Sequence, residues 1–143
     1  FDAEVRVIPR GFLALQGPDA EAVLQDRGFA VSDMDFMTAI EPKDGWFLSR
    51  TGYTGEDGFE IGLSPEKAED FAKALLQDPH VEWIGLGARD SLRIEAGLPL
   101  YGLDMDEKTD PVLAGWPWRA RQSAAGGRIV VVRAGSVRHD QPA

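Results

Sequence analysis

Residues 58–76, GFEIGLSPEKAEDFAKALL, join a strand pattern directly to a helix pattern. In the first part Phe59, Ile61 and Leu63 alternate with glycine or charged residues, which is the period of a strand that buries one face. In the second part apolar residues recur every three or four positions, the period of a helix with one buried face. A serine, a proline and a glutamate at 64–66 supply the helix start. The stretch predicts a strand and a helix that share one core.

The same two periods recur on both sides of this stretch, separated by glycine- and proline-rich turns. Their order is β-α-β-β-β-α-β-α, which predicts an α+β fold with an antiparallel sheet. From the N-terminus we expect a strand or hairpin over 5–15, a short helix to about 26, strands over 34–40, 46–51 and 59–63, a helix from 64, a strand over 81–86, a helix over 88–96 and a last strand-like run over 129–132.

The composition is that of one globular domain and excludes several classes of site. The chain has 143 residues and no cysteine, which excludes disulfides, thiolate nucleophiles and thiolate metal ligands. Its histidines, His80 and His139, form no metal motif, so we predict no metal site. The net charge of −9 disfavours phosphate backbones and anionic lipids, and no apolar run is long enough for a membrane helix. We therefore expect neither a nucleic-acid nor a membrane partner.

The charge changes sign near residue 111. Residues 1–111 carry 23 acidic and 10 basic residues, whereas residues 112–143 carry 1 acidic and 5 basic residues. We predict a folded domain over 1–111. We expect the tail over 112–143 to be poorly ordered and to pack weakly, because it has little apolar surface to offset the entropy of ordering.

The glycine-rich segment 52–58 leaves two interpretations open. Glycines recur every three positions, a spacing that matches neither a dinucleotide-binding nor a P-loop motif. The segment is either an irregular connection between strands or a place where the backbone lets a ligand approach closely. Tyr53, Glu56 and Asp57 lie within it, so a ligand there would meet an aromatic ring and carboxylates.

Glu60 lies on the polar face of the strand that follows. It is either a solvated carboxylate, the partner of Arg89 or Arg93 on the later helix, or a clamp for a ligand with two adjacent N–H donors. We predict that the tips of Glu60 and Arg89 lie within about 10 Å of each other in one concavity beside the glycine segment.

Two segments carry a family resemblance. SRTGYTGEDGFEI at 49–61 and GLGARDSLRIEAGLPLYG at 85–102 resemble the signature segments of the glycine cleavage system T-protein family of aminomethyltransferases. FLALQGP at 12–18 and DMDE at 104–107 fit the same family in order and spacing. The resemblance implies a ferredoxin-like middle domain, with helices packed on one face of its sheet.

The resemblance also implies an activity and its site residues. Members of this family take an aminomethyl group from the lipoyl arm of H-protein, release ammonia and pass the one-carbon unit to tetrahydrofolate. The pterin-binding glutamate of the family falls on Glu60, the substrate-contacting arginine on Arg89 and the motif tyrosine, which lines the folate pocket, on Tyr53. No catalytic residue is assigned here, because the family's catalytic aspartate belongs to a more N-terminal segment.

After residue 113 the family pattern stops. We therefore expect an internal piece of the folate-binding region, inactive alone, followed by a tail that is a truncated or frame-shifted reading or a natural variant. The implied compartment is the cytoplasm for a bacterial protein and the mitochondrion for a eukaryotic one. Two alternatives are the folate-binding region of a sarcosine- or dimethylglycine-oxidising enzyme and a non-catalytic folate-binding module. The absence of cysteine counts against the module, whose usual motif contains one.

Overall fold

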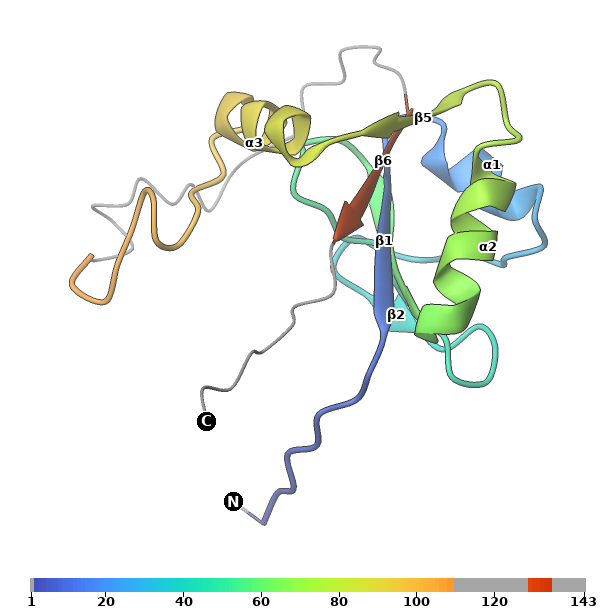
Figure 1. The fold of residues 1–143 in the computed structure, drawn as a ribbon, viewed down its shortest axis with the longest axis horizontal. Coiled ribbons are helices and arrows are strands. Elements are labelled where there is room, and N and C mark those ends of the chain that lie inside the picture. Colours follow the sequence, from blue (N-terminus) through green and yellow to red (C-terminus); the bar gives the residue numbers. More distant parts are fainter. Residues whose placement is uncertain (1, 110–128, 135–143) are drawn as a thin grey trace.

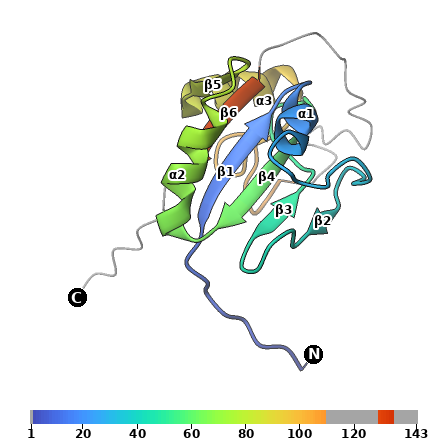
Figure 2. The same cartoon turned by 90° about the vertical axis from the view of Figure 1, so that its right-hand side faces the viewer.

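A computed structural model describes residues 2–109 and 129–134 of the chain. Its centre is a six-stranded sheet with the strand order β2-β3-β4-β1-β6-β5 (Figures 1 and 2). The elements are β1 Gly11–Gln16, α1 Ala20–Gln25, β2 Ala39–Ile40, β3 Phe47–Ser49, β4 Gly58–Leu63, α2 Pro65–Leu75, β5 Val81–Ile84, α3 Leu86–Glu95 and β6 Ile129–Ala134.

The four central strands form an antiparallel sheet in the order β3-β4-β1-β6. With α1 and α2 they give the succession β-α-β-β-α-β, the ferredoxin-like arrangement. The predicted α+β class is therefore confirmed. At the margins, β2 extends the sheet beside β3 and β5 pairs with β6. The β5–β6 pair is parallel, which the prediction of an antiparallel sheet did not include.

The main core lies between the sheet and two of the helices. Figure 1 shows α1 and α2 together on one face of the sheet, as predicted. Helix α3 lies on the other side, which the prediction of helices on one face did not include. Alternate residues of β1 and β4 point into this core because successive side chains of a strand face opposite ways. Its fully buried members include Leu15, Leu24, Leu48, Phe59, Ile61, Leu63 and Leu75.

The structure differs from the sequence-based expectation at both ends. Residues 2–10 precede the first strand without regular structure, so the predicted strand or hairpin reduces to β1. Ile129–Ala134, expected within a weakly packed tail, forms β6 between β1 and β5. A weakly packed tail therefore does not include these six residues. The remaining tail, 112–128 and 135–143, lies outside the described residues. Within the described part, no helix is long and apolar enough to cross a membrane.

Candidate functional site

Glu60 lies in the middle of β4, on the face of the sheet opposite the main core. Its backbone pairs with Ala14 of β1 and Ser49 of β3, and its side chain is half-buried. The Thr51 hydroxyl donates a hydrogen bond to Oε2 of Glu60 over 2.6 Å. Ser49 Oγ lies 2.7 Å from Thr51 Oγ1, and it donates there because the single Thr51 hydroxyl proton is already used. One carboxylate oxygen of Glu60 is thus held, and no hydrogen bond to the other is found among the described residues 2–109 and 129–134.

Tyr53 and Arg89 are brought together from distant parts of the chain. The Arg89 guanidinium lies over the Tyr53 ring, with its Cζ atom 4.7 Å from the ring centroid. The Tyr53 hydroxyl donates to the backbone oxygen of Pro99, just beyond the end of α3. Both contacts attach the glycine segment to α3 and its following loop. Arg89 is half-buried, and no hydrogen bond of its guanidinium is found within the described part of the chain.

The glycine segment packs closely against other residues of the chain. For two of its glycines this packing supports the interpretation as an irregular connection between strands. A Cβ atom on Gly52 would lie 1.7 Å from Oε1 of Gln16. The fully buried Gln16 side chain donates to the Thr51 oxygen at 3.0 Å and accepts from Thr54 Oγ1 at 3.2 Å. Gly55 has a φ of +80°, and a Cβ there would lie 2.5 Å from that of Ala96. Close packing inside the chain therefore accounts for these two glycines without a ligand.

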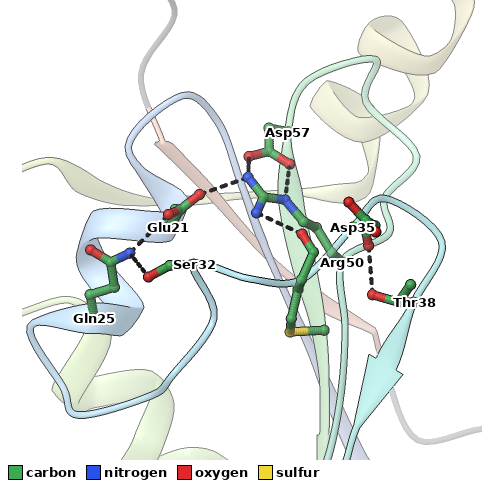
Figure 3. Close-up of polar contacts among 8 residues, drawn as sticks. Glu21, Gln25, Ser32, Asp35, Thr38, Arg50 and Asp57 are labelled. Carbon is green, nitrogen blue, oxygen red and sulfur yellow. Dashed lines mark hydrogen bonds and ion pairs between the residues drawn. The ribbon is translucent and has the colours of Figure 1, made fainter.

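Arg50 organises a charged cluster that the sequence analysis did not identify (Figure 3). Its guanidinium bonds to both oxygens of Asp57 at 3.0 and 2.6 Å, to Glu21 Oε2 at 2.7 Å and to the Met34 backbone oxygen at 3.0 Å. The bond to Asp57, with that to Glu21, raises the pKa of Arg50 above its ordinary value. The sequence did contain a signal for this cluster, because the oppositely charged Arg50 and Asp57 stand near the two ends of the glycine-rich segment. Asp57 is thereby engaged and is not a free carboxylate of the site.

Arg93 has a structural role and is not the partner of Glu60. It is 3% exposed and bonds to Asp90 at 2.7 Å, to Asp104 and to the backbone oxygen of Leu98 at 3.2 Å. The hydrogen bond to Asp90, with that to Asp104, raises the pKa of Arg93. Asp104 also accepts from the Leu100 amide at 2.8 Å. This network holds the 97–105 loop beside α3.

Of the three predicted site residues, the structure joins Tyr53 directly to Arg89 and links Glu60 to the same segment through Thr51. A carboxylate, an aromatic ring and a cation suit a flat, polar, nitrogen-rich ligand. The distance between the tips of Glu60 and Arg89 stays a prediction. No group of three or more potential metal ligands occurs in the described ranges 2–109 and 129–134.

Known proteins resemble this chain over most of its length. Residues 7–123 match the family described as the GCVT N-terminal domain, and this match runs past the boundary predicted at 111, which itself stays a prediction. The mitochondrial aminomethyltransferase of Solanum tuberosum is 50% identical over 126 residues, which cover 82% of this chain and 31% of the relative. The aminomethyltransferase of Thermus thermophilus is 46% identical over 123 residues, which cover 79% of this chain and 33% of that relative.

A solved structure shares both the fold and the sequence. The crystal structure of glycine cleavage system aminomethyltransferase T from Bartonella henselae superposes with a TM-score of 0.70 and is 52% identical. The superposition covers 74% of this chain and 30% of that one. The chain thus spans about a third of the length of the proteins it matches.

Proposed function

This chain belongs to the GCVT N-terminal domain family of glycine cleavage aminomethyltransferases, and on that premise we propose that it binds tetrahydrofolate through Glu60, Tyr53 and Arg89. The parent activity we propose is transfer of a one-carbon unit from the aminomethylated lipoyl arm of H-protein to tetrahydrofolate, with release of ammonia. Because the chain spans about a third of its relatives, it supplies part of the pterin site. No residue of the chain is assigned the role of the catalytic acid.

The Glu60 carboxylate, which Thr51 holds through one oxygen and which makes no other hydrogen bond among the described residues, is the single observation that carries the proposal. Thr51 fixes the carboxylate by one oxygen, and Thr51 belongs to the same loop as Tyr53. The amino-pyrimidine edge of a pterin presents two adjacent N–H donors, which a carboxylate accepts as a charge-assisted pair, one on each oxygen. Oε2 can accept one of them beside Thr51, because each carboxylate oxygen has two acceptor positions. A fixed carboxylate loses less entropy on binding than a free one.

Tyr53 and Arg89 complete the proposed pocket in complementary ways. The Tyr53 ring offers a flat apolar surface, and its hydroxyl is already used by Pro99. Arg89 is oriented by the ring below it, so its guanidinium is positioned before a substrate arrives. These residues bind and orient the folate and do not themselves move a proton.

The proposal is tested by titrating the 143-residue chain with tetrahydrofolate and following tryptophan fluorescence and binding heat. We expect the Glu60→Gln variant to bind at least about tenfold more weakly, because it loses the charged acceptor. Glu66→Gln is the matched control: Glu66 is exposed in the first turn of α2, on the far face of the sheet. Unchanged affinity in Glu60→Gln, or an equal loss in Glu66→Gln, would contradict the assignment.

The related functions are separated by a second measurement. A folate-binding region of a sarcosine- or dimethylglycine-type enzyme would bind the same folate but would not respond to aminomethylated H-protein. We expect the chain to bind lipoylated H-protein as well, and a chain that binds folate alone would favour that alternative or a non-catalytic folate-binding module. The proposed compartment is the cytoplasm in a bacterium or the mitochondrion in a eukaryote, and the name of the Solanum tuberosum relative supports the second.

A further inference from the structure

One charged pair joins the two ends of the loop between β3 and β4. We call these joined ends, Arg50 and Asp57, the neck of the loop. Arg50 directly follows β3, and Asp57 directly precedes β4. The Asp57 carboxylate accepts two parallel bonds from Nε and Nη2 of Arg50, a geometry that fixes the orientation of both side chains. The Asp57 backbone oxygen also accepts from the Gly17 amide at 2.7 Å, which attaches the same neck to the end of β1.

Two further bonds of Arg50 attach this neck to the rest of the domain. Glu21 belongs to α1, and Met34 belongs to the connection between α1 and β2. Figure 3 shows Glu21 and Asp57 approaching the guanidinium from different sides. The side chains of Arg50, Glu21 and Asp57 are 16%, 31% and 29% exposed, so water screens this cluster less than it screens a surface pair.

The side chains of Arg50 and Glu60 lie on opposite faces of the sheet. The Arg50 Cζ atom lies 5.3 Å from the centroid of the Phe59 ring, and Phe59 is fully buried in the core under α1 and α2. Glu60 follows Phe59 in β4 and so faces the other way. Arg50 therefore does not touch a ligand held by Glu60, and any effect on that ligand must pass through the loop backbone.

We propose that Arg50 is a positioning residue of the folate site: by clamping Asp57, Glu21 and the Met34 carbonyl, it fixes the loop that carries Thr51 and Tyr53. This inference rests on the proposed function. Thr51 sets the Glu60 carboxylate and Tyr53 sets the Arg89 guanidinium, so a loosened neck disorders both contacts at once. Nothing in the clamp itself needs to meet the folate.

The Arg50→Lys variant tests the clamp because lysine keeps the charge but not the fork of parallel donors. Asp57→Asn tests the same pair from its other side and keeps the side-chain volume. We expect both variants to bind tetrahydrofolate at least about tenfold more weakly than the parent chain at a temperature where each is folded. We also expect faster amide hydrogen exchange in residues 51–57, with exchange in α2 little changed.

Arg27→Lys is the matched control for general loss of stability. The Arg27 side chain is 20% exposed and also makes several bonds, to the Val23 oxygen at 2.8 Å, to the Ala74 oxygen at 3.1 Å and to Asp78 at 3.5 Å. These bonds tie the end of α1 to the end of α2 and do not involve the glycine segment. We expect a lowered Tm in this variant, with folate affinity within about twofold of the parent.

The outcomes separate the two proposals. If the parent chain binds no folate, the proposed function fails for this chain, and the exchange measurement still tests the clamp. If Arg50→Lys and Asp57→Asn leave both loop exchange and affinity unchanged, the positioning role is overturned. If Arg27→Lys weakens affinity as much as the clamp variants at equal Tm, the effect is general stability and the positioning role is again overturned.

Discussion

The Arg89 guanidinium stacks on the ring of Tyr53 with 4.7 Å between its Cζ atom and the ring centroid, although 36 positions separate the two residues. One comes from the glycine segment before β4 and the other from α3. The Tyr53 hydroxyl separately reaches the Pro99 oxygen. The ring and the hydroxyl of Tyr53 thus have different partners, so a substitution can remove one contact and keep the other.

Tyr53→Phe removes only the hydroxyl and should leave the stacked ring in place. We expect it to lower the free energy of unfolding by about 0.5–1.5 kcal/mol, the net value of one hydrogen bond, with folate affinity within about twofold. Tyr53→Leu removes the aromatic ring and should weaken folate binding about tenfold. Urea unfolding and folate titration of both variants measure the two effects. A larger affinity loss in the phenylalanine variant would show that the hydroxyl, and not the ring, serves the ligand.

Gly52→Ala places a methyl group in space that Gln16 already fills. Because the new Cβ would lie 1.7 Å from Gln16 Oε1, Gln16 must move and release the Thr51 carbonyl. We expect a loss of about 1–3 kcal/mol in unfolding free energy, typical of overpacking in a tight interior. Gly87→Ala is the control, since nothing lies within 4 Å of its Cβ position in α3. It should be neutral or stabilising by up to about 1 kcal/mol, and thermal unfolding compares the two.

Asp104 makes the docking of the 97–105 loop sensitive to acid. The hydrogen bond from the Leu100 amide, with the bond from Arg93, lowers the pKa of Asp104 below its ordinary value of 3.8. A carboxyl group whose pKa is lower in the folded state than in the unfolded state stabilises the fold when it is ionised. This stabilisation is present above the unfolded-state pKa and is lost as the pH falls through the folded-state pKa. We therefore expect the loop to detach below pH 3.8, seen as faster amide exchange of Leu100. In Asp104→Asn this step should be absent; if it persists, another group titrates.

Val131→Pro tests whether β6 is an integral strand. Val131 pairs with Leu15 on one side and Trp83 on the other, so a proline there removes a backbone donor from the interior of the sheet. We expect a loss of about 1–3 kcal/mol, the cost of leaving a buried polar group unsatisfied, together with altered Trp83 fluorescence. Ala39→Pro in the marginal strand β2 should be less harmful. Equal stability of Val131→Pro and the parent chain would mean that the sheet does not depend on β6.

Local periodicity was sufficient to predict most elements of the fold. The alternation through Phe59, Ile61 and Leu63 and the start at Ser64–Glu66 correctly placed β4 and α2. Each of these signals depends on residues only a few positions apart, whose spacing decides which face of an element can be buried. The signature segments likewise indicated the family, and the comparisons confirmed it.

Local periodicity could not predict which partner a side chain or a strand would find in the folded chain. Arg89 and Arg93 are four positions apart on one helix, yet one stacks on Tyr53 and the other is buried between Asp90 and Asp104. The parallel pairing of β6 with β5 likewise joins strands that are far apart in sequence.

The sequence by itself determined most of the strands and helices and the segments that carry the family motif. Tertiary structure alone decided that Gln16 fills the space beside Gly52 and that Arg50 closes the loop leading to Glu60. The physical reason is that propensity and periodicity act within a few residues. A buried amide or guanidinium, in contrast, must find its partners among whatever distant backbone and side chains the completed fold brings within hydrogen-bonding distance.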